Sequence, residues 1–476
     1  MLSSVIVVLM LLSCTCGENP AIQVVLNNKG LQYGKHAAAG WIQEKLEHIT
    51  LPDIPGKVKI IFGTIDYTLT GVTILKCDFP EPSVEFLQDV PGFKASISGL
   101  SIALKGGWQT RFGIIHDGGT FNMAIFNVDV ASVVHLGKDA DGHPSVATNS
   151  CNAEIGNVDI TFHGGASWII NPFVSHFKGR IRNEIQEKIC PAVTESIESF
   201  ENHLKAMNVS FDVDQVLSLD LPLTSEPVIE ASSLNLGLKG EFYSIKTHKE
   251  PPFESQPFTM PEQPGYMLSV GMSDFTLNTA SYGYYSADLL HVLITDSMIP
   301  PCSPVHLNTS SMGKFIPQLS KLFPDLLMNL MVYAKEAPEF TFKPNALTVD
   351  IKVIVKASAI APNATQIPLF TLDVDSEFSS KLLIDGGSVK GSVTMNNLTL
   401  TLVASEVGSF KTDGLQNLAK MGVELILVKV QAILKNGIIL PRLKHAQLVN
   451  SVLKMEEGFI AVFSDVEVFL THRIFN

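Results

Sequence analysis

The 476-residue sequence contains no uninterrupted apolar run that is long enough to cross a lipid bilayer as a helix. Residues 421–434 are interrupted by Glu424 and Lys429. The apolar residues 5–12 (VIVVLMLL) are too few for a span, and small and polar residues follow them through Gly17. This pattern predicts a secretory signal peptide over residues 1–17, with a buried first strand as the alternative. We therefore expect a secreted, extracellular chain without a transmembrane span.

Cysteine is also scarce. Of the six cysteines, Cys14 and Cys16 fall in the predicted signal peptide, which leaves four. Four cysteines in a chain of this length are too few for a disulfide scaffold, so a hydrophobic core must supply the stability. Cys151 precedes a predicted strand and Cys190 lies on a predicted helix, so a bond between them would hold that helix to the sheet. Two separate buried thiols are the alternative.

Basic side chains are too few to make either half of the chain cationic. The whole chain has 34 basic and 47 acidic residues. Residues 18–226 contain 15 basic and 24 acidic residues, a net charge of −9, and the remainder contains 19 and 23, a net charge of −4. This balance argues against nucleic acid as a partner and against a membrane contact that is mainly electrostatic.

The motifs of common enzymes are missing as well. The sequence has no H-E-x-x-H, G-x-S-x-G, G-x-x-x-x-G-K-[ST] or G-x-G-x-x-G pattern, and residues 18–476 have no C-x-x-C. We therefore predict no enzymatic activity, no catalytic residues, no metal site and no cofactor.

A proline-rich run divides the chain into two halves. Residues 241–264 contain five prolines, which exclude helix interior and central strand and predict an extended connector. An ordinary surface loop is the alternative. Each half is long enough for a core of its own. We predict an N-terminal domain over residues 18–240, the linker over 241–264 and a C-terminal domain over 265–476.

The residue patterns of the two halves predict the same order of elements. Each half begins with a helix, continues with long curved strands and then has a long helix. The first half has a helix (27–49), strands (57–136) and a short strand (158–163), and a one-residue slip in alternation near Ile125 suggests a bulge. Nine apolar residues from Phe173 to Leu204 then follow at helical spacing, with a kink expected at Pro191. The second half has strand patterns (267–279 and 288–294), a helical segment (311–323), alternation from Leu347 with a slip after Met395, a helix (414–434) and closing strands (446–453 and 459–470). These patterns indicate two similar α+β modules.

One predicted loop has features of a lipid contact. Residues 105–112 (KGGWQTRF) lie between two strand patterns, at the expected end of a hairpin. Lys105 and Arg111 supply cations, and Trp108 and Phe112 supply aromatic side chains, a combination that suits headgroups over acyl chains. The alternative is a hairpin end whose Trp108 turns back into the core.

Four sequons agree with secretion. If the chain is secreted, they predict surface glycosylation at Asn208, Asn308, Asn363 and Asn397.

Several short motifs, spread in order along the chain, resemble one family. They are Asn19-Pro20, Gly30-Leu31-x-Tyr33, Leu51-Pro52-Asp53, the pair Cys151 and Cys190, Gly240-Glu241-Phe242-Tyr243, and Asp296-Ser-Met-Ile-Pro300. Together they resemble the bactericidal/permeability-increasing protein and lipopolysaccharide-binding protein family, to which phospholipid and cholesteryl ester transfer proteins are related.

The resemblance implies an α+β boomerang of two elongated barrels. Each barrel is a curved antiparallel sheet wrapped on a long helix, and the proline-rich linker and a central sheet join the two. It also implies an apolar pocket in each barrel that holds phospholipid, and a disulfide between Cys151 and Cys190.

The leading functional hypothesis is a secreted innate-immune, antibacterial protein that binds lipopolysaccharide (its lipid A) and phospholipid at the bacterial outer membrane surface. Acyl chains enter the pockets, and candidate headgroup contacts gather at one tip: Lys57, Lys59, Lys94, Lys105, Trp108, Arg111 and Phe112. The family's tip is rich in Lys and Arg, whereas Gln109 and Thr110 stand here. An extracellular phospholipid transfer protein without a pathogen role is the first alternative, followed by a hydrolase and a solid scaffold.

Overall fold

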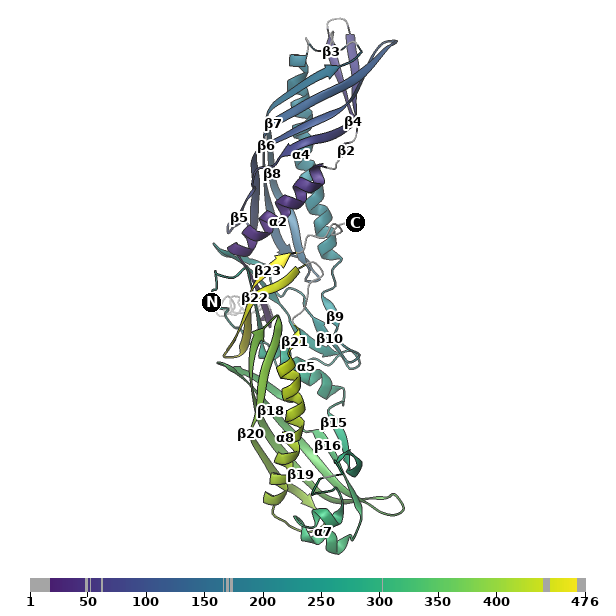
Figure 1. The fold of residues 1–476 in the computed structure, drawn as a ribbon, viewed down its shortest axis with the longest axis vertical. Helices are drawn as coiled ribbons and strands as arrows, with labels where there is room; N and C mark the ends of the chain where they lie inside the picture. Colours follow the sequence, from purple (N-terminus) through teal and green to yellow (C-terminus); the bar gives the residue numbers. More distant parts are fainter. Residues whose placement is uncertain are drawn as a thin grey trace, which may run out of the picture.

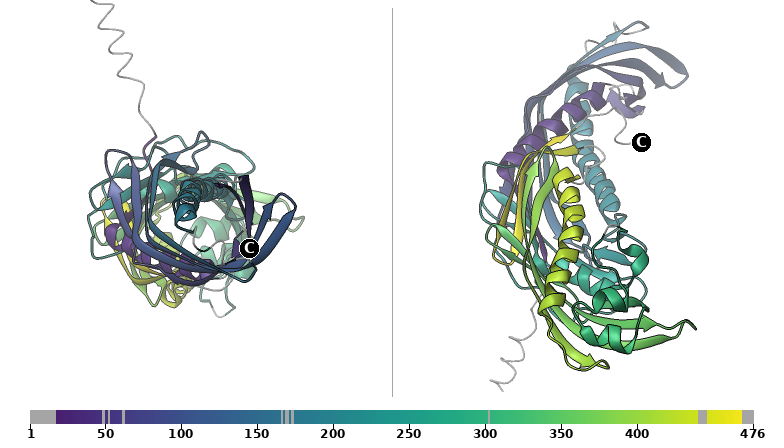
Figure 2. Two further views of the ribbon diagram at one scale, coloured as in Figure 1. Left: turned by 90° about the horizontal axis from the view of Figure 1, so that it is seen from above. Right: turned by 60° about the horizontal axis from the view of Figure 1, so that its bottom comes forward.

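The molecule is elongated and curved, and it consists of two sheet-and-helix halves that meet at a central sheet (Figures 1 and 2). The computed structural model describes residues 18–468 except 48, 49, 52, 61, 62, 166, 168–170, 172, 173, 302 and 440–445. The predicted signal peptide, residues 1–17, lies outside the described residues.

The first half curls an antiparallel sheet around its long helix α4, in the upper part of Figure 1. Strands β4, β6, β7 and β8 follow one another in this sheet. Its elements are β1 (Ile22–Asn27), α2 (Asn28–Glu47), β2 (Thr50–Leu51), β3 (Ile54–Ile60), β4 (Gly63–Asp78), β5 (Ser83–Leu87), β6 (Gly92–Phe112), β7 (Ile115–Lys138), β8 (Pro144–His163), α4 (Val174–Lys205), β9 (Ser210–Asp212), β10 (Leu217–Asp220), β11 (Val228–Ile229), β12 (Ser233–Leu238) and β13 (Glu241–Ser244).

The second half repeats this layout in the lower part of Figure 1, with α8 as its long helix. Strands β16, β18, β19 and β20 are neighbours in its sheet. Its elements are β14 (Leu268–Ser273), α5 (Asp274–Ser286), β15 (His291–Thr295), the 3-10 helix η2 (Asp296–Met298), α6 (Thr309–Met312), α7 (Pro317–Leu322), β16 (Leu327–Ala334), β17 (Glu339–Lys343), β18 (Ala346–Ile360), β19 (Gln366–Asp385), β20 (Ser388–Ser405), α8 (Asp413–Asn436), β21 (Ile438–Ile439), β22 (Ala446–Glu456) and β23 (Phe459–Val468).

The central sheet contains strands from both halves. Its order is β11-β12-β1-β14-β23-β22, so β1 of the first half pairs directly with β14 of the second. The linker runs beside β1, because the side chains of Asn19, Gln23 and Asn27 donate hydrogen bonds to carbonyl oxygens between positions 255 and 266. These contacts confirm the predicted fold, in which two curved sheets, each with a long helix, are joined by a central sheet.

The hydrophobic stripe of α4 forms part of the N-terminal core, as its spacing predicts. Ile181 is 5% exposed, and Ile185 and Ile189 pack against the same cluster, which includes Trp108 and Phe121 of the sheet. The helix continues through Pro191. The two slips in strand alternation also correspond to register irregularities, opposite β7 residues 125–130 and β20 residues 395–397.

Two predicted elements of the second half are wrong. The strand pattern 267–279 stops at Ser273, where α5 begins with Asp274 in its first turn, a position at which an acidic side chain favours a helix. A short apolar pattern fits either a strand or a helix, so the spacing of the apolar residues could not distinguish the two. The helical segment 311–323 is two short helices, because Gly313 ends α6 and Pro317 begins α7.

Candidate functional site

An apolar pocket lies between α4 and the inner face of the N-terminal sheet. The space enclosed among its side chains is about 20 Å³, room for about one water molecule, and about 320 Å³ is free when the open mouth is included. Polar groups in its lining come only from the Tyr67 and Lys188 side chains. The lining residues are Ile54 of β3, Tyr67 and Leu69 of β4, Met123 of β7, and Ile181, Ile185 and Lys188 of α4. Such an apolar lining suits an acyl chain, and its side chains must move apart to admit one.

Trp108 supports this part of the core and is not at the surface. Its side chain is 1% exposed, its ring meets Phe162 edge to face at 5.8 Å, and its Nε1–H donates to the backbone oxygen of His163 at 3.2 Å. The prediction of an exposed aromatic is therefore wrong for Trp108, and the alternative, a tryptophan turned into the core, is correct.

Residues 105–112 are also not a loop, because β6 continues through all of them to Phe112. The glycines that suggested a loop allow close packing within the sheet. A Cβ atom on Gly106 would come within 2.7 Å of the Phe121 ring and 2.9 Å of the Thr70 backbone oxygen.

The hairpin turn lies two residues further on, at Gly113 and Ile114, at the upper end of Figure 1. Gly113 has φ +57°, a left-handed conformation that glycine adopts readily. Ile114 is 96% exposed and Ile115 is 63% exposed. The sequence reading missed these two isoleucines, although a glycine followed by two β-branched residues between alternating runs was a usable signal.

A row of polar side chains crosses the sheet just below this turn. Lys57, Asp66, Arg111 and His116 are directly opposite one another on β3, β4, β6 and β7. Residues directly opposite on neighbouring strands share a face of the sheet. The Lys57 Nζ and Asp66 Oδ1 atoms are 3.4 Å apart. Asp66 therefore neutralises part of the positive charge that Lys57, Lys59 and Arg111 bring to the tip.

The other predicted cations lie further from the turn. Lys105 is exposed seven residues before Phe112 on β6. Lys94 is near the opposite end of β6, roughly 60 Å of strand from Phe112 at about 3.3 Å per residue, and its Nζ is 3.6 Å from Glu85 Oε1. Lys94 is therefore not a tip residue, because the long unbroken β6 separates two positions that the sequence reading placed together.

The Cys151–Cys190 disulfide is present and joins β8 to α4. Among the sequons, Asn208, Asn363 and Asn397 are exposed. Asn308 is half-buried, and its side-chain oxygen accepts the Ser311 backbone N–H at the start of α6.

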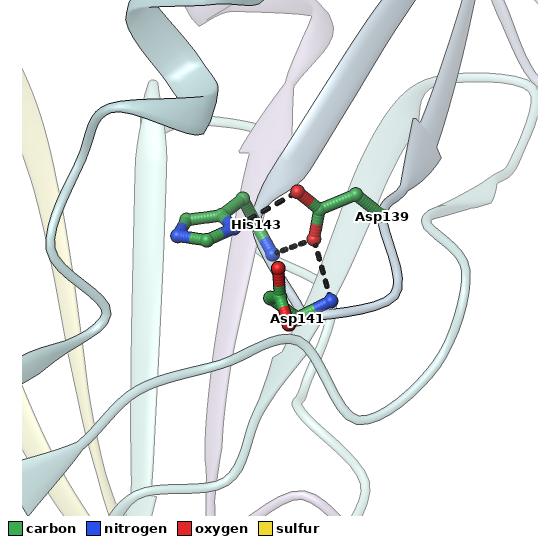
Figure 3. A group of neighbouring side chains, drawn as sticks. All are labelled: Asp139, Asp141 and His143. Atoms are coloured by element: carbon green, nitrogen blue, oxygen red, sulfur yellow. Dashed lines mark hydrogen bonds and ion pairs between the residues drawn. The ribbon is translucent and has the colours of Figure 1, made fainter.

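A separate cluster occupies the β7–β8 turn (Figure 3). Asp139 accepts hydrogen bonds from the backbone N–H groups of Asp141 and His143, and its Oδ2 lies 2.9 Å from His143 Nδ1. Desolvation raises the pKa of the Asp139 carboxyl, but the hydrogen bonds and charge of His143 outweigh it, so the pKa lies below its ordinary value. These interactions account for the cluster as the hydrogen-bonded core of a turn.

No helix among the described residues combines the length and the apolar character that crossing a bilayer requires. Comparison with known families gives two matches. The N-terminal domain model of the LBP / BPI / CETP family matches residues 30–200, and the C-terminal domain model matches residues 211–468.

Individual relatives match over nearly the whole chain. Bactericidal permeability-increasing protein of Sebastes schlegelii is 35% identical, with 96% of this chain and 97% of that protein covered. Lipopolysaccharide-binding protein of Bos taurus is 29% identical, with 94% of each chain covered. A crystal structure of lipopolysaccharide binding protein superimposes with a TM-score of 0.58 at 25% identity, covering 94% of this chain and 99% of that chain.

Proposed function

This chain belongs to the LBP / BPI / CETP family, and from that premise we propose that it is a secreted innate-immune protein that binds bacterial lipopolysaccharide and phospholipid in apolar pockets. The family match over both halves of the chain carries this proposal, and the apolar lining between α4 and the N-terminal sheet agrees with it. Relatives named for lipopolysaccharide binding align with both halves of the chain. The function needs no catalytic residue, metal or cofactor.

The pocket lining supports binding through the acyl chains. Five of its seven residues, Ile54, Leu69, Met123, Ile181 and Ile185, are apolar. Each methylene that moves from water to such a lining contributes about 0.8 kcal/mol, whereas one surface cation near an anionic membrane contributes about 1 kcal/mol. A few methylenes therefore outweigh any single headgroup contact.

The side chains at the tip also indicate that acyl contacts contribute more to binding than headgroup contacts. Ile114 and Ile115 are exposed at the turn, and Phe112 directly opposes Ile115 across the hairpin. We assign these apolar side chains to acyl contact, and Lys57, Lys59 and Arg111 to headgroup contact with lower weight. Lys105 is a peripheral cation in this scheme, and Trp108 is a core support.

The test compares lipopolysaccharide binding by wild type, Ile114→Ser, Arg111→Glu and Lys94→Glu at low and high salt. We expect about a tenfold loss for Ile114→Ser at both salts, because part of an isoleucine no longer leaves water. We expect a modest loss for Arg111→Glu that fades at high salt, because charges at a rim act mainly on the approach of a ligand. Lys94→Glu is the matched charge control and should bind like wild type.

A hundredfold loss for Arg111→Glu at both salts would contradict the acyl-led mechanism. An equal loss for Lys94→Glu would replace the tip with a general electrostatic effect. Organic extraction of the purified protein followed by mass spectrometry adds a second readout. Phospholipid in the extract without any lipopolysaccharide binding would favour the alternative, an extracellular phospholipid transfer protein, which the negative net charge and Asp66 also favour.

Secretion and domain boundaries complete the proposal. We propose a signal peptide over residues 1–17, domains over 18–240 and 265–476, and glycans at Asn208, Asn363 and Asn397. Strand β13 (Glu241–Ser244) pairs with β10 of the first half, so the extended part of the predicted linker begins after Ser244. Asn308 is the least suited of the four sequons, because its side chain already caps α6. Peptide mapping of the secreted protein before and after deglycosylation tests the signal cleavage site and the glycans, and limited proteolysis of the folded protein tests the domain boundaries.

A further inference from the structure

Helix α8 carries two separate apolar stripes. The inner stripe begins with Leu415, Ala419 and Val423, which belong to or pack against the C-terminal core. It continues at helical spacing through Ile426 and Ile433, which are 62% and 60% exposed. The inner stripe is therefore covered in the first turns of α8 and open in the later ones.

The outer stripe consists of Met421, Leu425 and Val428, which are 56%, 65% and 67% exposed. Their spacing of four and three residues places them on one face of the helix. At about 100° per residue, this face lies about 150° round the helix from the inner stripe. In Figure 1 and the right-hand view of Figure 2, no other element is drawn over α8. Leu418, three residues before Met421 on the same side of the helix, packs against the C-terminal core, so the outer stripe is open from Met421 onward.

We propose that the outer stripe docks α8 flat against a lipid surface that contains anionic headgroups. An exposed apolar stripe bordered by lysines is the pattern of helices that lie in the membrane interface. Lys429 borders the stripe on one side and Glu424 on the other, and Lys435 lies seven residues beyond Val428. Neither lysine has an ion-pair partner among the described residues. The proposal rests on lipid binding as the function of this chain and adds a second contact, far from the N-terminal tip.

Charge and area favour lipid over a second copy of the chain. The net charge of −13 repels a second copy and an anionic surface alike at long range, so the preference for lipid rests on Lys429 and Lys435, which lie close to the stripe. A stable protein interface buries about 800 Å² on each partner, far more than three side chains on one helix face supply. Shallow insertion into a lipid interface has no such threshold.

Docking by the outer stripe leaves the later part of the inner stripe, Ile426 and Ile433, uncovered on the other side of α8. Ile426 and Ile433 would then lie just behind the contact, on the same helix. In this arrangement α8 separates the lipid surface from the apolar interior by one helix diameter.

A dye attached to α8 reports this contact without interference from the tip. Leu425→Cys, labelled with an environment-sensitive fluorophore, is mixed with phosphatidylcholine vesicles with and without phosphatidylglycerol. Labelled wild type corrects for native cysteines. Val403→Cys is the matched control, because Val403 is 57% exposed on β20 of the same half. We expect a blue shift and increased emission for the label at 425 with the anionic vesicles and no change at 403.

A binding variant completes the test. Val428→Glu should reduce flotation with the anionic vesicles about tenfold, and Val403→Glu should not reduce it. A silent label at 425, equal responses at 425 and 403, or a dimer in sedimentation that Val428→Glu dissociates would each overturn the proposal. If lipopolysaccharide still binds the tip in those cases, only the docking of α8 fails. If no lipid binds anywhere, the proposed function fails with it.

Discussion

The two long helices occupy matching places in the two halves, yet they are held differently. On α4, Ile181 is 5% exposed, Ile185 and Ile189 pack into the core, and Cys190 is bonded to β8. On α8, Leu415 is the buried residue among those described, and the second half of the helix exposes apolar side chains on two faces. The same layout therefore contains one helix that packs into the core as far as Cys190 and exposes Phe200 beyond it, and one whose buried contacts lie mainly at its beginning. Further along α8, Gln431 accepts the Val393 backbone N–H of β20 at 3.0 Å.

This difference indicates that the two long helices have different roles. The buried contacts of α4 keep its side of the N-terminal pocket, Ile181 and Ile185, in place. A helix held by its first turns costs less free energy to displace, because displacement breaks fewer buried contacts. The comparison predicts that equivalent changes in the two helices have unequal consequences.

Removing the disulfide should give the largest loss of stability, and it should reduce the difference between α4 and α8 in how firmly each helix is held. In the chain-entropy account, closing this loop of 39 residues is worth about 4 kcal/mol as an upper value. We expect the double variant Cys151→Ala, Cys190→Ala to lower the free energy of unfolding of the N-terminal half by about 3 to 4 kcal/mol. Hydrogen exchange should speed up in α4 and stay unchanged in α8. Equal acceleration in both helices would contradict the idea that the bond holds α4 specifically.

The sequence predicted both helices well, because a stripe of regular spacing depends only on the residues in the helix. It did not predict how tightly each stripe is covered, because covering depends on strands far away in the chain. The tip shows the same limit. Alternation of apolar and polar residues located β6, but the glycines near Trp108 fit both a turn and close strand packing. The pairing of β6 with β7 shows that these glycines lie within the strand.

Lys94 illustrates a second limit. Sequence proximity to Lys105 suggested one cluster of charges, but an extended strand moves neighbours apart by about 3.3 Å per residue. The pocket could not be listed from the sequence for the converse reason. Its lining comes from β3, β4, β7 and α4, which are distant in sequence and brought together by the curl of the sheet.

A matched pair of substitutions sharpens the comparison with a somewhat smaller effect. Ile181→Ala removes a nearly buried side chain and should cost about 2 to 4 kcal/mol, whereas Ile426→Ala removes one that is 62% exposed and should cost less than about 1 kcal/mol. Chemical denaturation followed by hydrogen exchange in each half gives both values. Similar costs at the two positions would mean that α8 is as well covered as α4, contrary to the exposures.

The smallest expected effect concerns the ion pair that joins the two halves. Lys29 of α2 donates to Asp465 of β23 at 2.7 Å, and the Met267 backbone N–H and the Asn450 side chain donate to the same carboxylate. Burial raises the pKa of the Asp465 carboxyl, but these hydrogen bonds and the charge of Lys29 outweigh it, so the pKa lies below its ordinary value.

A lowered pKa in the folded state means that Asp465 stabilises the fold above the ordinary aspartate pKa of about 3.9, and that this contribution is lost as pH falls through the folded-state pKa. Asp465→Asn should therefore lower the free energy of unfolding by about 1 kcal/mol at pH 7, a value reduced for the exposure of Lys29, and by less at pH 3. Asp66→Asn is the control, because its partner Lys57 is 73% exposed and the pair should contribute little at either pH. Denaturant titrations at the two pH values measure both variants. A deficit in Asp465→Asn that grows toward pH 3 would show that the protonated carboxyl stabilises the fold more than the charged one, contrary to a lowered pKa.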